Sequence, residues 1–447
     1  MNDNDRSIVG FTMIGHAMVH TYELSIPILM TIWLLEFSTT AATLGYVVTI
    51  GYGLFGVGAL PGGILVDRYG SRALICACLA GMGLSFLLVS LTPGILALAV
   101  ALGIWGIAAS VYHPAGLTLI SNGVRDRGAG FAYHGMAGNI GIALGPLATA
   151  LLLVAFDWRL VAAALAIPSL AAAAAGLVIK FDETAAVESV GIPDGGERDD
   201  GGDGGGERRD GSENESEDRD ATRSPTSADS LAGLAAETRR LFTVAFLTVF
   251  VVVTFSGLYY RGVLTFLPDL LGNFLETAVG DSQLLFDPES PMAEEFDLAQ
   301  YLYVGLLVVG IAGQYVGGRL VDAVEPDRGL AVVFVALVVI ALVFVPTAQA
   351  GLWPLLAVSV VLGFVLFALQ PLEQATIAKY SRPDTRGLSF GYTYLAIFGI
   401  GALGAAIVGT VLTYASPSVM FVVLAGFAGV ACLLALSLGR RDDPGEW

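Results

Sequence analysis

The chain has 447 residues, of which 55% are hydrophobic and only 14% are charged, and its mean hydropathy is +0.73. A water-soluble domain cannot bury that much apolar surface, so this composition predicts an integral membrane protein. The formal net charge of −18, with no basic patch, excludes a nucleic-acid partner and leaves the lipid bilayer as the expected surroundings.

The polar segments are rich in acid and almost free of lysine, which occurs only at Lys180 and Lys379. This balance suits a high-salt cytoplasm and indicates a halophile, with ordinary acidic loops as the alternative. The three cysteines lie in apolar segments without metal-ligand spacing, so neither a metal site nor a cofactor is predicted. The N-terminus is interpreted as a retained first helix and not as a cleaved signal peptide.

Hydropathy along the chain predicts an all-α membrane protein. A membrane-spanning helix needs roughly 20 mainly apolar residues. Twelve segments meet this requirement: 8–35, 42–64, 73–91, 95–118, 128–154, 158–179, 241–271, 299–321, 328–347, 352–377, 386–413 and 417–438.

Between the sixth and seventh segments the composition changes to Gly, Asp, Glu and Ser, which cannot form a buried core. We therefore expect three parts: an N-terminal six-helix bundle over 1–180, an acidic disordered linker over 181–238, and a C-terminal six-helix bundle over 239–447.

The distribution of basic residues predicts the topology. With the N-terminus inside, all 22 lysines and arginines except Arg159 and Arg261 fall on the cytoplasmic side. Both termini are therefore expected in the cytoplasm, with the protein in the cytoplasmic membrane.

The two halves also repeat each other. The stretch "GGILVDRYGSR" (62–72) resembles "GGRLVDAVEPDR" (317–328), and "RGAGFAYHGMAGNIGIALGP" (127–146) resembles "RGLSFGYTYLAIFGIGALGA" (386–405). Duplicated six-helix halves around a central cavity are typical of transporters. The repeat predicts two pseudo-symmetric bundles.

These features resemble the major facilitator superfamily, whose signature between the second and third spans matches Gly63-x-x-x-Asp67-Arg68-x-Gly70-x-Arg72. The resemblance implies that these residues gate the conformational change by latching the two halves. In the second copy Asp322 is retained, whereas Ala323 replaces the arginine, which implies a weaker latch there.

Within that superfamily, "YHPAG" (112–116) and "GNIGIALGPL" (138–147) resemble the fosmidomycin-resistance-like efflux group. The fourth span lacks the arginine of many proton-coupled members, and the glycine motif of antiporters is only partly present in the fifth span.

Several polar residues lie in the spans that line the cavity in this superfamily, and they are the candidates for the solute or proton pathway. His16, His20 and Glu23 share one helix face by their i, i+4, i+7 spacing. His113 in the fourth span corresponds in the repeat to Gln370 in the tenth, so the two are expected to face each other across the cavity. A hydrogen-bonded structural role is the alternative for each histidine.

Arg261 and Glu373 complete this set. The guanidinium of Arg261 offers a two-pronged contact for a carboxylate or phosphate, and the alternative is that it extends to the outer membrane interface. Glu373 is a candidate carrier of a coupling proton. His134 is expected mainly to pack near the cytoplasmic end of the fifth span.

The resulting hypothesis is a monomeric secondary transporter that exports a small organic solute by alternating access, driven by protons or sodium, as an antiporter. Import or uniport of an organic anion or another metabolite is the alternative, and a non-transporting receptor is a further one. No nucleophile–base pair recurs at useful spacing, so an enzyme is not expected.

Overall fold

The computed structural model of the protein describes residues 1–188, 231–279, 297–381 and 386–439. Within these ranges all regular structure is helical. Eleven helices are long and apolar enough to cross a membrane, or twelve when a bent pair over the second predicted segment is counted as one span. Each of the twelve predicted segments coincides with a helix or with a broken helix, which confirms the all-α membrane fold.

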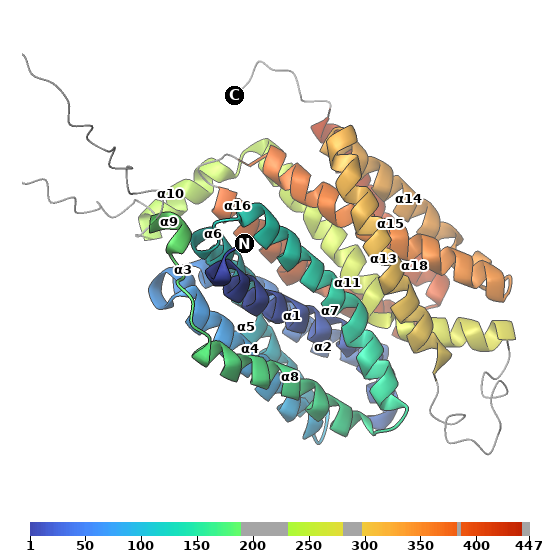
Figure 1. Ribbon diagram of the computed structural model, residues 1–447. Coiled ribbons are helices and arrows are strands. Elements are labelled where there is room, and N and C mark those ends of the chain that lie inside the picture. Colours follow the sequence, from blue (N-terminus) through green and yellow to red (C-terminus); the bar gives the residue numbers. More distant parts are fainter. Residues whose placement is uncertain (189–230, 280–296, 382–385, 440–447) are drawn as a thin grey trace, which may run out of the picture.

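The N-terminal half contains the helices α1 (Asp3–Glu36), α2 (Ala41–Val57), α3 (Ala59–Tyr69), α4 (Ser71–Ser90), α5 (Ile95–Ser110), α6 (Tyr112–Gly123), α7 (Arg127–Leu153) and α8 (Trp158–Val178). The C-terminal half contains α11 (Val244–Val279), α13 (Leu298–Ala323), α14 (Pro326–Ala348), α15 (Leu352–Lys379), α16 (Arg386–Tyr394), the π-helical segment η4 (Leu395–Ile400), α17 (Leu403–Tyr414) and α18 (Pro417–Leu438). Figure 1 shows the two halves as bundles lying side by side, coloured blue to green and yellow to red.

Two short helices lie at the edges of the predicted linker. They are α9 (Ala185–Glu188) and α10 (Leu231–Leu241), so residues 185–188 and 231–238 are helical where the sequence predicts disorder. The rest of that prediction, over 189–230, lies outside the described residues.

Small residues bring the helices of the N-terminal half close together. A Cβ atom on Gly141 of α7 would lie 2.2 Å from the carbonyl oxygen of Ala17 on α1. Helices in lipid associate through such close packing, because lipid gives no hydrophobic drive between them. This contact holds α1 and α7 in the register that presents their polar faces together.

The fourth predicted segment, 95–118, is interrupted in the structure close to Pro114. α5 ends at Ser110 and α6 begins at Tyr112, four and two residues before Pro114. Proline has no backbone N–H for the carbonyl four residues earlier, so the helical hydrogen bond to Ser110 is lost. The break places His113 in the first turn of α6.

α2 packs against η4 and α17 of the other half and closes one end of the interface. The backbone N–H of Ala42 donates to Thr413 Oγ1 at 2.8 Å, and Thr49 Oγ1 donates to the carbonyl of Ala402 at 3.0 Å. The contact continues to Gly56, where an added Cβ would lie 2.0 Å from the backbone nitrogen of Gly399. No side chain fits between the helices at that point.

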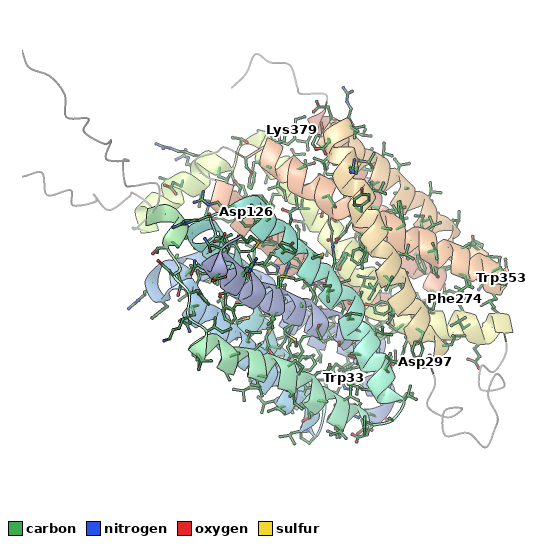
Figure 2. The ribbon with its side chains drawn as sticks, viewed as in Figure 1. Trp33, Asp126, Phe274, Asp297, Trp353 and Lys379 are labelled. Carbon is green, nitrogen blue, oxygen red and sulfur yellow. The ribbon has the colours of Figure 1, made fainter. Side chains whose placement is uncertain are left out.

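Figure 2 places Asp126 and Lys379 toward one end of the bundles, and Trp33 and Trp353 toward the opposite end. Ala42 follows shortly after Trp33 in the chain, and Thr413 lies near the C-terminal end of α17. The contacts between Ala42 and Thr413 therefore belong to the end that carries Trp33.

Candidate functional site

A buried ion pair joins the two halves. Arg261 on α11 donates from Nη2 to Glu23 Oε1 on α1, and the two residues are only 2% and 1% exposed. The guanidinium carbon lies 4.0 Å from the ring centroid of Tyr52, whose hydroxyl donates to the Glu23 carbonyl at 2.9 Å. The charge of Arg261 is thus matched by a carboxylate and by an aromatic face. The interpretation that Arg261 extends to the membrane interface is wrong, because its side chain is enclosed.

A row of hydrogen bonds continues from Glu23 along α1. His20 Nδ1 lies 2.6 Å from Glu23 Oε2, and His20 Nε2 lies 3.1 Å from His16 Nε2. His16 Nδ1 in turn lies 2.7 Å from the carbonyl oxygen of His134 on α7. The spacing of residues 16, 20 and 23 on one helix face therefore produces a continuous polar row that starts at the cation of the other half.

The other two histidines surround His16. His134 stacks on its ring with centroids 3.9 Å apart and planes 14° apart, while His113 meets it edge-on at 5.3 Å. His113 also packs against Tyr394 and Phe398 of the C-terminal half, at 5.4 and 6.3 Å. All four histidines of the chain form one cluster at the interface between the halves.

A cavity of about 370 Å³ adjoins this cluster. Its polar lining comes from both halves and consists of His16, His20, Glu23, His113, His134, Asn139, Ser256, Tyr260, Gln314, Gln370, Glu373, Gln374 and Tyr394. Leucine, isoleucine and phenylalanine side chains complete the wall. A cavity in which apolar side chains surround convergent polar groups is the usual form of a small-molecule site.

Gln370 and Glu373 belong to the part of the wall contributed by α15. Gln314 Nε2 donates to Gln370 Oε1 at 2.5 Å, which links α13 to α15. Glu373 is 5% exposed, and among the described residues its Oε1 has no hydrogen-bond partner. His113 and Gln370 line the same cavity, as their equivalent positions in the repeat predict. Gln370 is hydrogen-bonded to Gln314 of its own half. His113 lies between His16 of its own half and Tyr394 of the other.

The site contains three residues that were not among the predicted pathway residues: His134, Gln314 and Tyr52. His134 was expected mainly to pack, yet it stacks on His16 and lines the cavity. Gln314 carried a usable signal, since it is an amide inside the apolar eighth span. Tyr52 carried none, because a tyrosine in a span gives no indication that its ring will face a buried guanidinium.

The predicted gating residues lie away from the cavity. Arg72 donates from Nε to the carbonyl of Gly176 at 2.8 Å, and its backbone N–H donates to Glu183 at 3.2 Å, so these bonds stay within its own half. Gly70 has a φ of +79°, a conformation that favours glycine and explains that position of the motif.

The other residues of the motif are exposed or lie in open space, except Asp67, whose side chain is not among those described. Arg68 and Asp322 are exposed, and Gly63 has open space around it. The side chain of Asp67 lies outside the described residues. The latch across the halves therefore stays a prediction.

Two bundles that enclose a polar cavity, joined beside it by a buried ion pair, define a multi-pass membrane transport protein. The model of the Major Facilitator Superfamily matches residues 12–280 and 270–447, and the chain belongs to this family. It is a transporter and not an enzyme, its partners are a small-molecule solute and the lipid bilayer, and the major facilitator fold expected from the sequence is confirmed.

Solved structures with this fold include a bacterial homolog of the human lysosomal transporter Spinster, in an inward-facing and occupied conformation. It has a TM-score of 0.73 and 12% identity, covering 100% of this chain and 99% of that chain. The nucleoside transporter NupG has a TM-score of 0.68 and 12% identity, covering 99% and 100%.

The puromycin resistance protein pur8 of Streptomyces alboniger is 34% identical over 108 residues, which are 24% of this chain and 22% of that protein. The chain thus matches about a fifth of the length of this curated relative.

Proposed function

We propose that the protein is a secondary active transporter that exports a small organic solute across the cytoplasmic membrane by alternating access, as an ion-driven antiporter. The observation that carries this proposal is the Glu23–Arg261 pair, which crosses the two halves beside a polar cavity. A solute or ion that competes for either partner would weaken the contact between the halves. Occupancy would thereby be coupled to their movement.

Protons are the proposed coupling ion, with sodium as the alternative. The hydrogen-bonded row from Glu23 through His20 to His16 is a continuous path of ionisable side chains inside the membrane-spanning region, and such groups commonly mark proton relays. Glu373, on the opposite wall of the cavity, is a second proposed carrier.

Efflux is favoured by the partial likeness to a protein named for puromycin resistance and by the motifs of the fourth and fifth spans. Because the cavity lies between the halves of one chain, we propose that a monomer transports. The basic residues favour cytoplasmic termini, so the end closed by Ala42 and Thr413 would face outward and the cavity would open inward. The acidic, lysine-poor composition favours a halophilic host.

Import or uniport of an organic anion is the second candidate. It is favoured by Arg261, because within the described residues its Nε has no hydrogen-bond partner although it is buried. An anionic group that reached this nitrogen would complete its hydrogen bonding.

The test is a thermal-shift screen of small organic compounds at high salt on the purified protein, followed by flux in proteoliposomes. The proposal predicts that a stabilising compound exchanges across the membrane and accumulates when a pH gradient is imposed. Accumulation against its gradient on the side that corresponds to the cytoplasm would instead favour import. A compound that binds but never exchanges would favour a receptor.

A further inference from the structure

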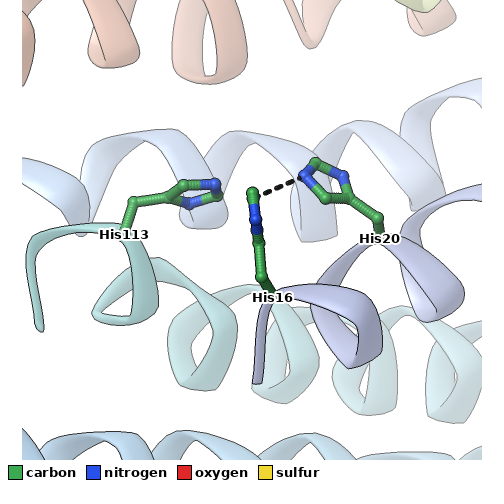
Figure 3. Close-up of side chains that lie close together, drawn as sticks. All are labelled: His16, His20 and His113. Atoms are coloured by element: carbon green, nitrogen blue, oxygen red, sulfur yellow. Dashed lines mark hydrogen bonds between the residues drawn. The ribbon is translucent and has the colours of Figure 1, made fainter. Parts of the chain in front are cut away.

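We propose that His16, His20 and His113 form a binding site for a divalent transition-metal ion, with Zn²⁺ as the representative ion. One ring nitrogen from each of the three side chains lies within 4.8 Å of the other two. Figure 3 shows the three rings converging, with the hydrogen bond drawn between His16 and His20. The proposal is independent of which solute the protein transports, since it concerns ion binding to the resting protein.

The local fold produces this convergence. His16 and His20 are one turn apart on α1 and project from the same face. His113 comes from the first turn of α6, directly after the break in the fourth span. Metal-ligand spacing along the chain is absent, because the third ligand is 93 residues away in sequence from the second, as the numbers His113 and His20 show.

The hydrogen bonds of the His16 and His20 rings leave the Nε2 atom of each ring available as a metal ligand. His16 Nδ1 faces a backbone carbonyl, so it must donate a hydrogen, and this leaves Nε2 as the acceptor atom of a neutral ring. His20 Nδ1 faces the Glu23 carboxylate and must donate as well. A carbonyl or carboxylate behind the second ring nitrogen is the arrangement that orients metal-binding histidines.

The two free nitrogens face each other. His16 Nε2 and His20 Nε2 are 3.1 Å apart, and in two neutral rings both would present lone pairs across this gap. That arrangement is repulsive unless a positive centre lies between or beside the two atoms. A metal ion bound by both lone pairs would supply it.

The distances are close to those of a tetrahedral ion. Zinc–nitrogen bonds of about 2.0–2.1 Å place two ligand nitrogens about 3.4 Å apart. The pair from His16 and His20 is already close to this value, whereas the 4.8 Å span of the three nitrogens must shrink for His113 to bind as well. Three histidine ligands leave a fourth position open for water or for a donor atom of a solute in the adjoining cavity of about 370 Å³.

The nitrogen ligands fit a borderline-soft divalent ion better than a hard one. The carboxylate of Glu23 is balanced by Arg261, and Glu373 lines the same cavity as a further acid. Imidazole nitrogen suits zinc, copper and nickel, whereas magnesium and calcium prefer several oxygen ligands. We therefore expect Zn²⁺, Co²⁺ and Ni²⁺ to bind, and Mg²⁺ not to compete.

The test uses the full chain in detergent, purified through a tag without histidine, stripped with a chelator and titrated with Co²⁺. A nitrogen-ligated, four- or five-coordinate Co²⁺ absorbs visible light strongly, whereas Co²⁺ on surface carboxylates keeps its water and absorbs weakly. We expect one strongly absorbing Co²⁺ per chain, displaced by Zn²⁺ and not by Mg²⁺. Absence of this band would overturn the proposal and assign the contact between His16 and His20 to a shared proton.

Variants locate the ion. His20→Gln and His113→Gln should each weaken Co²⁺ binding by at least about 100-fold, because each removes one ligand. The matched control is His134→Phe, which keeps an aromatic ring to stack on His16 and keeps the backbone carbonyl. It should change the affinity by less than about 3-fold. Equal binding by all three variants would overturn the assignment.

Folding is checked by the melting temperature of each metal-free variant. If a glutamine variant does not fold, the band and stoichiometry of the unsubstituted chain and of His134→Phe still decide the proposal. One further measurement decides it in the same way: a rise in the melting temperature of the unsubstituted chain with Zn²⁺ supports the site, and no rise contradicts it.

Discussion

Glu23 on α1 and Arg261 on α11 form a buried ion pair across the interface between the two halves of the protein. The same carboxylate accepts from His20, so the pair ends the polar row that crosses the histidine cluster. The pair therefore couples the packing of the two bundles to the chemistry of the cavity wall.

The first prediction concerns this pair. Glu23→Gln or Arg261→Gln alone should destabilise the protein by about 3–5 kcal/mol, because each leaves the partner charge buried and unpaired. The double variant should recover a large part of this loss, since no lone charge remains. Melting temperatures of the three variants in one detergent give the comparison. Additive losses would show that the two residues do not interact.

The second prediction concerns transport through the histidine cluster. His20→Ala and His113→Ala should abolish counter-flow of a transported solute in proteoliposomes, because both side chains line the cavity at the interface of the halves. Elution as a single species and a cooperative melt would show that each variant is folded. Full counter-flow in both variants would contradict a pathway role for these side chains.

The third prediction separates binding from coupling at Glu373. Its carboxyl group is buried and its Oε1 has no partner among the described residues. Glu373→Gln keeps the size and removes the charge, so solute exchange should persist while accumulation driven by a pH gradient is lost. Accumulation at the unsubstituted level would exclude Glu373 as a carrier of the coupling ion.

The fourth prediction concerns the contact between α2 and η4, at the end of α2 opposite to Ala42. Gly56→Ala places a Cβ 2.0 Å from the backbone nitrogen of Gly399, so it should force α2 and η4 apart and disfavour this conformation. The matched control is Gly53→Ala on the same helix, where the nearest atom across the contact, the Gly399 carbonyl oxygen, lies 3.9 Å away.

The measurement is disulfide cross-linking of Ala42→Cys with Thr413→Cys, in a background where the three native cysteines are replaced. Its yield should fall with Gly56→Ala and stay unchanged with Gly53→Ala. A fall in both or in neither would contradict the steric argument.

The fifth prediction concerns the gating motif. Arg72→Ala should destabilise the N-terminal half by about 1–3 kcal/mol, because the carbonyl of Gly176 loses its charged donor. Arg68→Ala is the matched control, since Arg68 is exposed and should change the melting temperature little. Equal effects of the two substitutions would show that the bonds of Arg72 add nothing to stability.

The sequence alone predicted which residues would carry the candidate site on α1. An i, i+4, i+7 spacing requires only a helix, and an apolar segment long enough to cross a membrane has to be helical because lipid satisfies no backbone group. The face formed by His16, His20 and Glu23 follows directly from this requirement. The twelve apolar segments follow from the same local physics, and the duplicated halves follow from the internal sequence repeat.

Only the tertiary structure decided the partners. Glu23 and Arg261 are 238 residues apart in the chain, and the position of Arg261 near the outer part of its segment was equally compatible with a solvated side chain. The stacking of His134 on His16 depends on how closely α7 approaches α1 at Gly141. Such contacts are set by packing between helices, which hydrophobic periodicity does not encode, and they turn four scattered histidines into one cluster beside a cavity.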